Sequence, residues 1–162
     1  VVEDAKGKIW KFKIEDGSKE QILETNAGKF NDVAASPINN CVVTAGADGF
    51  VRLWDYGNKR QFCARNFKTQ SEATCIEWVP YNKRNSGRLL AVGFSDGIIR
   101  LVVINQNELT LIKADKVLKR KIILMKCSPD GATLSAMDDG GDLFFLSLNP
   151  LDLQDMKPYC LH

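Results

Sequence analysis

The strongest constraint on the fold is a hairpin signature that recurs along the chain. In its first copy, two apolar runs flank a tight turn, with the sequence VVTAGADGFVRLWD over residues 42–55. Asp and Gly suit such turns because both tolerate left-handed backbone angles. The turn pairs of three copies are Asp48 and Gly49, Asp96 and Gly97, and Asp139 and Gly140. A hairpin that returns after 48 and then 43 residues indicates an array of similar units.

The copies also match outside the turn. Arg52 aligns with Arg100, and we expect Gly46 to align with Gly93. The first copy ends in Trp54 and Asp55. The tryptophan position of the three copies holds, in order, Trp54, Val102 and Leu146.

A proline precedes each hairpin, at Pro37, Pro80 or Pro129. Before it lies an apolar stretch whose alternate residues share one face of a strand, since strand side chains alternate with period two. Two slots are matched in this way: Val33, Ile76 and Met125 occupy the first, and Ala35, Trp78 and Cys127 the second. Each unit is therefore predicted to hold strand, proline turn, strand, Asp-Gly turn, strand and a weaker fourth strand.

Four strands in roughly 40 to 50 residues are typical of a β-propeller blade. We predict an all-β chain that forms a propeller segment of about three and a half four-stranded blades. The expected units are residues 1–26 (the C-terminal half of a blade), 27–70 (a full blade), 71–115 (a blade with a long loop between its first two strands) and 116–162 (a divergent blade). Closed propellers have about four to eight blades, so this segment is expected to be a partial ring whose free face favours self-association.

Composition argues against catalysis. The single histidine is His162, so no imidazole lies inside the array, and the five cysteines include no C-x-x-C pair. The formal net charge of +2 is too small to indicate nucleic acid, and no apolar stretch is long enough to span a membrane. We expect a cytosolic, non-enzymatic protein without cofactor or metal. Three nearby carboxylates, Asp138, Asp139 and Asp142, lack the spacing of a calcium loop and are expected to cap the turn.

Two basic segments are the candidate partner-binding sites. The long loop of the second full unit carries Tyr81, Lys83, Arg84 and Arg88. The connection that follows that unit carries Lys116, Lys119, Arg120 and Lys121, on the opposite rim of the ring. Loops on a rigid scaffold often bind partners, and these charges suit acidic protein surfaces such as tubulin. The alternative for both segments is a solvated charged loop.

The hairpin residues Asp48, Gly49, Trp54 and Asp55 resemble the WD40 repeat. In that family a Gly-His pair, a Ser or Thr, the turn Asp and the Trp form a hydrogen-bonded cluster. Here Lys29 stands where the histidine would be. The resemblance therefore implies a divergent WD40 propeller, held more by apolar packing than by that cluster.

A narrower resemblance covers about residues 7–148. GKIWKFKI, AGKFNDVAASP, TAGADGFVRLWDY and ATCIEWVPYNKRNSGRLLAVGFSDGIIRLVVI are similar to the cilia- and flagella-associated WD-repeat proteins of the axonemal inner-arm dynein tether complex. This implies a cytoskeletal scaffold of the cilium or flagellum that tethers dynein to doublet microtubules and supports motility. One alternative is a general WD40 adaptor in another cytosolic or nuclear assembly. A propeller enzyme would need a catalytic imidazole and an RNA binder a strong basic field, and the sequence provides neither inside the array.

Overall fold

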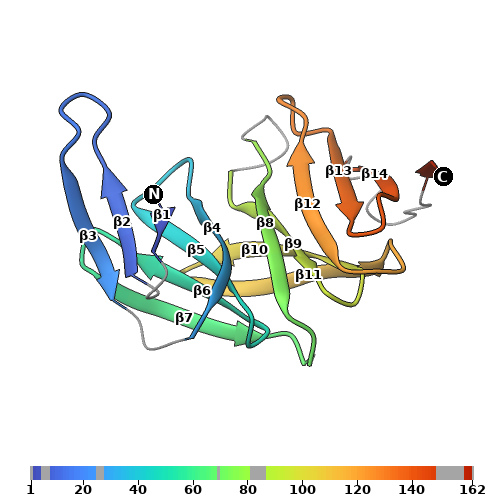
Figure 1. The fold of residues 1–162 in the computed structure, drawn as a ribbon, viewed down its shortest axis with the longest axis horizontal. Coiled ribbons are helices and arrows are strands. Elements are labelled where there is room, and N and C mark those ends of the chain that lie inside the picture. Colours follow the sequence, from blue (N-terminus) through green and yellow to red (C-terminus); the bar gives the residue numbers. More distant parts are fainter. Residues whose placement is uncertain are drawn as a thin grey trace.

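Every regular element in the described part of the chain is a β-strand (Figure 1). The computed structural model describes residues 2–4, 8–24, 28–68, 70–80, 87–148 and 159–161. The strands form four antiparallel sheets, and within each sheet every strand pairs with the next strand along the chain. Their bounds are β1 (Val2–Glu3), β2 (Lys8–Phe12) and β3 (Lys19–Glu24); β4 (Phe30–Ala35), β5 (Cys41–Gly46), β6 (Phe50–Asp55) and β7 (Arg60–Asn66); β8 (Ala73–Trp78), β9 (Leu89–Phe94), β10 (Ile98–Asn105) and β11 (Glu108–Lys116); β12 (Ile122–Cys127), β13 (Thr133–Asp138), β14 (Leu143–Ser147) and β15 (Tyr159–Leu161).

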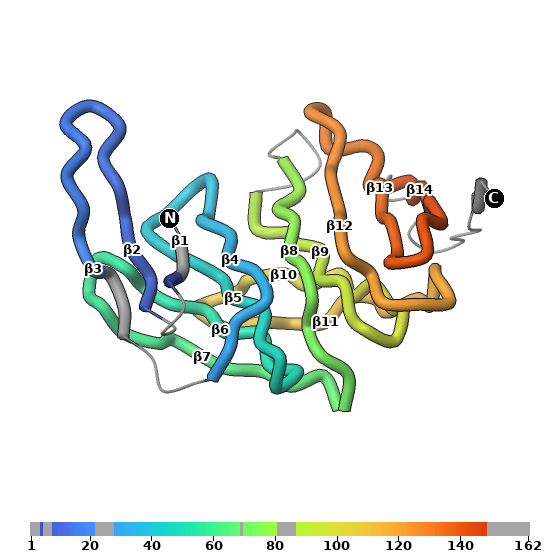
Figure 2. The backbone as a smooth tube through the Cα atoms, in the orientation of Figure 1, coloured from blue at the N-terminus to red at the C-terminus, as the bar shows by residue number. Residues whose placement is uncertain are grey.

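The sheets are arranged as an open arc of propeller blades. The first strands of the three four-stranded sheets, β4, β8 and β12, stand side by side, and β4 contacts β8 as β8 contacts β12 (Figure 1). The β1–β3 sheet and the β12–β14 strands lie at opposite ends of the arc (Figure 2). The prediction of an all-β, partial propeller is confirmed. The structure adds the short strand β1, which pairs with β2, to the two strands expected at the N-terminal end.

Strand pairing confirms the two slots that were matched before each proline. Val33 lies opposite Thr44, Ile76 opposite Val92 and Met125 opposite Ala136, at the same place in each sheet. Each first strand also has a register irregularity near its start. The proline that follows cannot donate a ladder hydrogen bond, which suits a strand end.

Two alignments made from the sequence are wrong by one residue. The N–H of the left-handed turn glycine bonds to the carbonyl of Gly46 in the first copy, Phe94 in the second and Asp138 in the third. Gly46 therefore corresponds to Phe94 and not to Gly93. The left-handed glycines themselves are Gly49, Gly97 and Gly141, with φ of 78°, 79° and 88°.

The third turn therefore places Gly140 and Gly141, rather than Asp139 and Gly140, at the positions of the Asp-Gly pairs. The φ > 0 requirement decides this assignment, because only glycine adopts that angle without strain. Counted from Gly141, Leu143 lies two residues after the turn glycine, as Val51 does after Gly49.

The core is divided among the interfaces between neighbouring sheets. Val51 and Leu53 of β6, both fully buried, pack with Val92 and Phe94 of β9. The next interface joins Leu101 of β10 to the β12–β14 strands. The second and third strands of the β4–β7 and β8–β11 sheets are apolar on both faces because each of these two sheets is stacked on both sides.

The last sheet keeps one apolar face uncovered. Leu53, Leu101 and Phe145 each lie four residues after their turn glycine, yet they are 0%, 1% and 37% exposed. Leu143, two residues after the glycine, is 39% exposed, and Leu124 on β12 lies on the same face. This face is as apolar as a junction between two blades, but no described sheet packs against it.

Candidate protein-binding rims

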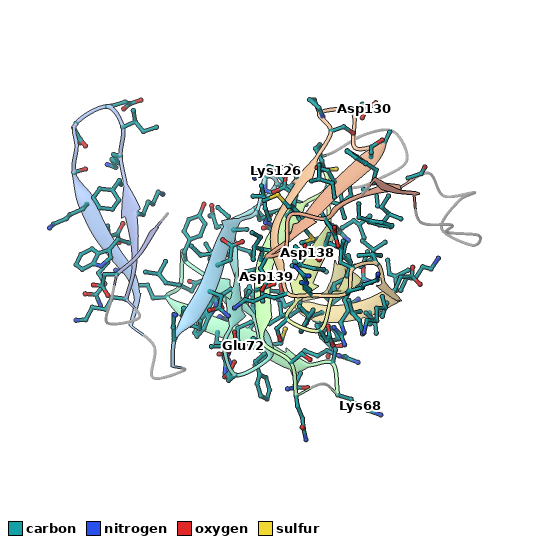
Figure 3. The ribbon with its side chains drawn as sticks, turned by 45° about the vertical axis from the view of Figure 1, so that its right-hand side comes forward. Lys68, Glu72, Lys126, Asp130, Asp138 and Asp139 are labelled. Atoms are coloured by element: carbon teal, nitrogen blue, oxygen red, sulfur yellow. The ribbon has the colours of Figure 1, made fainter. Side chains whose placement is uncertain are left out.

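Alternating strand directions divide the connections between two edges of the arc. We call rim A the edge with the β4–β5, β8–β9 and β12–β13 connections and the β6–β7 and β10–β11 turns. Rim B has the β5–β6, β9–β10 and β13–β14 turns and the connections from one sheet to the next. Figure 3 shows the two rims through Asp130 of the β12–β13 connection, at the top, and Lys68 of the β7–β8 connection, at the bottom.

On rim B, Asp48 holds the first turn together. Its carboxylate accepts hydrogen bonds from the N–H of Phe50 at 3.1 Å and from both terminal nitrogens of Arg52, at 3.1 and 2.5 Å. Burial acts to raise the pKa of Asp48, but these bonds outweigh it and the pKa is lowered from its ordinary value. The Asp48–Arg52 pair therefore stabilises the packing of the turn against β6.

The second turn repeats this arrangement more loosely. Asp96 accepts from the N–H of Ile98 at 3.0 Å, and its carboxylate lies 3.7 Å from the guanidinium of Arg100. That guanidinium stacks 4.0 Å above the ring of Phe94, where burial lowers the pKa of Arg100. A cation over a desolvated ring face is favourable, so Phe94 helps to stabilise Arg100 here, as Asp48 stabilises Arg52 in the first turn.

In the third turn the capping carboxylate belongs to Asp138. Its Oδ1 accepts from the N–H of Gly140 at 2.9 Å and of Asp142 at 3.0 Å. Asp139 is exposed, and it donates its own N–H to the carbonyl of Lys121. The guanidinium of Arg120 lies directly against Gly140, at the position a Cβ would occupy. A turn-capping role for the acidic cluster is thus carried by Asp138.

The second basic segment is only partly a connection. Lys116 is the last residue of β11, and it is exposed, as are Lys119 and Arg120. Lys121 instead pairs with Glu72 of the preceding connection at 3.2 Å. This pair, together with Asp139 next to it, offsets part of the positive charge, which weakens the case for a continuous basic surface here.

The WD40-type cluster is half present. The indole N–H of Trp54 donates to the hydroxyl of Thr44 at 3.0 Å, deep in the sheet, and the Trp54 ring meets Phe30 edge-on at 6.2 Å. Asp55 caps the β6–β7 turn by accepting from Gly57 N–H at 2.9 Å. Sequence reasoning named Trp54 and Asp55 but not Thr44, which its place between Val43 and Ala45 on a buried strand disguises.

On rim A, the first three candidate residues of the long loop, Tyr81, Lys83 and Arg84, lie outside the described residues. Arg88 is described and exposed, and its carbonyl accepts from the N–H of Ile104 at 3.0 Å. It lines a pocket of about 260 Å³ that sequence reasoning missed. The pocket lies between the β4–β5 connection of one sheet and the ends of β8 and β10 in the next.

Two acidic side chains that were not singled out join neighbouring sheets. Asp32 on β4 accepts from the N–H of Ile76 on β8 at 2.7 Å, and Glu77 on β8 accepts from the N–H of Cys127 on β12 at 3.0 Å. The sequence signal that could have identified them is an acidic residue within a mainly apolar first strand. Their contribution is structural, because each satisfies a backbone donor that no ladder reaches.

The described residues offer no sign of a metal centre or a membrane segment. No group of three or more His, Cys, Asp or Glu side chains among them is placed to hold a metal ion. Burial raises the pKa of Cys75 to about 11, so that thiol stays protonated at neutral pH. The part of the chain that the structure describes contains no helix long and apolar enough to cross a bilayer.

Residues 17–55 match the family model described as "WD domain, G-beta repeat". The chain therefore contains a WD40 repeat. The matched segment holds β3 of one sheet and β4, β5 and β6 of the next, so the sequence repeat is offset from the structural blade. WD40 propellers, in which blades stack through apolar faces and loops lie on two rims, are typically interaction scaffolds.

Three relatives show similarity at low identity. Mouse cilia- and flagella-associated protein 44 is 27% identical over 106 residues, or 63% of this chain and 6% of the relative. WD repeat-containing protein 90 is 25% identical in mouse and 26% in human, over 87% of this chain and 7% and 8% of the relatives. The chain thus spans less than a tenth of the length of these curated relatives.

Among solved structures, a chain in the crystal structure of a mitotic checkpoint complex superposes with a TM-score of 0.75. The match covers 95% of this chain and 45% of the other, at 13% sequence identity. At that identity the likeness concerns the fold alone.

Proposed function

We propose that this chain is a segment of a non-enzymatic WD-repeat scaffold in the axoneme of cilia and flagella. In this proposal the scaffold tethers dynein to doublet microtubules and supports ciliary motility. The observation that carries it is the similarity of this chain to cilia- and flagella-associated protein 44 over 63% of its length. The two loop rims of a rigid arc give such a scaffold surfaces for several partners at once, and modest contacts made together yield high avidity.

The test is where the full-length protein goes in a ciliated cell. A tagged copy is imaged before and after detergent and salt extraction of the axoneme, with a tagged soluble protein as the extraction control. Retention on the extracted doublets, together with altered dynein-dependent beating when the protein is removed, supports the tether. A signal that leaves with the soluble control, or normal beating without the protein, contradicts it.

A second candidate is a WD-repeat adaptor in a different cytosolic or nuclear assembly. The observation that favours it is the longer match to WD repeat-containing protein 90, which covers 87% of this chain and whose name specifies no organelle. Because a fold does not fix a function, the same scaffold serves either role. A nuclear or diffuse cytoplasmic distribution of the tagged protein favours the adaptor.

A further inference from the structure

We propose that the rim A pocket at the junction of the two sheets β4–β7 and β8–β11 binds a carboxylate-bearing side chain, Asp or Glu, of an extended peptide segment. This inference rests on the proposed scaffold role and names the chemistry of one partner. We call this pocket the junction pocket.

The junction pocket depends on two blades at once. Ser36, Ile38 and Asn39 of the β4–β5 connection form one side. Trp78 at the end of β8 and Ile104 near the end of β10 belong to the other. Trp78 and Ile104 also take part in the apolar cluster that joins the two sheets, so the packing of the junction fixes the pocket walls.

Charge selects the ligand. Arg88 is the one charged side chain among the described residues that line the pocket, and it forms no ion pair with any described residue. By contrast, Arg52 and Arg100 each face an aspartate. Without an acidic partner among the described residues, the guanidinium of Arg88 presents a planar donor fork that fits a carboxylate through two hydrogen bonds.

The rest of the lining suits a peptide. Asn39, Gln106 and Asn107 offer amide groups that both donate to and accept from peptide backbone. Ile38, 46% exposed at this site, offers an apolar contact for a neighbouring side chain. A volume of about 260 Å³ accommodates one or two side chains rather than a drug-sized ligand.

The β10–β11 turn presents its amides in a costly backbone conformation. Gln106 and Asn107 have φ of 48° and 68°, the left-handed pair of a two-residue hairpin whose flanking residues are Asn105 and Glu108. Such turns strongly favour Asn or Gly, and a glutamine at the first position is unfavourable. Strain of this kind persists where the surroundings hold it, and here it fixes two amide side chains at the pocket.

A carboxylate fits this site better than a phosphate group does. A phosphate carries up to two negative charges and is bound by clusters of basic side chains or by converging backbone N–H groups. The described lining provides a single cation. We therefore assign the pocket to acidic peptide side chains.

The test uses the 162-residue chain and two fluorescein-labelled eight-residue peptides. In one peptide Glu alternates with Leu, and in the other Gln replaces each Glu. Fluorescence anisotropy at low salt should show saturable binding of the Glu peptide, and Arg88→Gln should weaken it by about tenfold, as loss of a charged hydrogen bond does. Arg65→Gln, an equal charge change at an exposed position of β7, is the matched control and should leave binding unchanged.

Indole N–H signals in NMR spectra locate the binding. The indole N–H of Trp10 donates to Asp4 and that of Trp54 to Thr44, whereas the N–H of Trp78 has no acceptor among the described residues. The Glu peptide should shift the Trp78 signal and leave the other two in place. The proposal is overturned by equal binding of the Gln peptide, by unchanged binding to Arg88→Gln, or by no binding up to about 1 mM peptide. Those outcomes leave axonemal retention, the test of the scaffold role, untouched.

Discussion

The carboxylate of Glu77 accepts a hydrogen bond from the backbone N–H of Cys127 at 3.0 Å, across the junction between two sheets. The other carboxylate oxygen lies 3.1 Å from the ammonium of Lys126. Asp32 and Ile76 repeat the side-chain-to-backbone bond at the preceding junction, with 2.7 Å between donor and acceptor. Apolar packing between blades is non-directional, so these bonds are suited to fix how far one first strand slides along the next.

Glu77→Ala should therefore loosen the β8–β12 junction. The change leaves the N–H of Cys127 without its acceptor, which costs about 1 to 3 kcal/mol of unfolding free energy. Urea unfolding measures the loss, and hydrogen exchange at Cys127 should accelerate. Glu108→Ala, at an exposed residue of β11, is the control. Equal stability of the two variants would show that the bond contributes nothing.

Two turn glycines with similar backbone angles should respond differently to alanine. Gly97 and Gly141 have φ of 79° and 88°. A Cβ at Gly97 would overlap the carbonyl oxygen of Leu118, whereas a Cβ at Gly141 meets nothing within 4 Å. Gly141→Ala should lose only the cost of a left-handed alanine, about 1 to 2 kcal/mol.

Gly97→Ala should lose clearly more, because the rim B connection that follows β11 must move as well. The N–H groups of Val117 and Leu118 both bond to the carbonyl of Gly97, so the backbone there has little freedom to retreat. Thermal unfolding of both variants measures the difference. Similar losses in the two would mean that backbone angle alone governs these turns.

Sequence reasoning predicted the blade architecture because it depends on local signals. The Asp-Gly turn at Asp48, the proline at the end of each first strand and apolar runs on both strand faces are all readable in order along the chain. The third turn was misplaced because three aspartates and two glycines adjoin there. Only the backbone angle at Gly141 shows which glycine adopts the left-handed conformation.

The candidate site was predictable only in part. Arg88 was named because it ends a long basic loop. Its companions Ile38 and Gln106 come from residues far away in sequence and meet only when two blades stack. Lys121 shows the converse, since its partner Glu72 lies on the previous connection and the sequence does not indicate the pairing. Local sequence patterns therefore do not predict the contacts between blades.

Stability should depend on pH through Asp48. Burial raises and the bonds from Arg52 and Phe50 lower its pKa, with a net decrease from the ordinary 3.8. A carboxylate with a lower pKa in the folded chain binds fewer protons there than when unfolded. Its stabilising contribution is therefore present above the unfolded pKa and is lost as pH falls through the folded pKa.

Asp48→Asn should consequently cost about 1 kcal/mol at pH 7, a modest value because the carboxylate is partly exposed. The gap between variant and parent should close as pH falls below about 4. Denaturant unfolding across pH 3 to 7 gives the profile, with Glu15→Gln in the exposed β2–β3 turn as the control. A stability difference between variant and parent that stays constant with pH would mean that the shape of the side chain, and not its charge, causes the loss.

Equivalent positions on two blades should separate a covered face from a free one. Leu101 and Phe145 both lie four residues after a turn glycine, but Leu101 is 1% exposed and Phe145 is 37% exposed. Leu101→Lys buries a charge in the junction with β12–β14 and should prevent stable folding. Phe145→Lys should change the unfolding free energy little and should reduce self-association, because it places a charge on an apolar face that no described sheet covers. Circular dichroism and sedimentation velocity together measure both effects. Unfolding of Phe145→Lys would mean that this face is closed within the chain, and an unchanged association state would mean that copies do not meet through it.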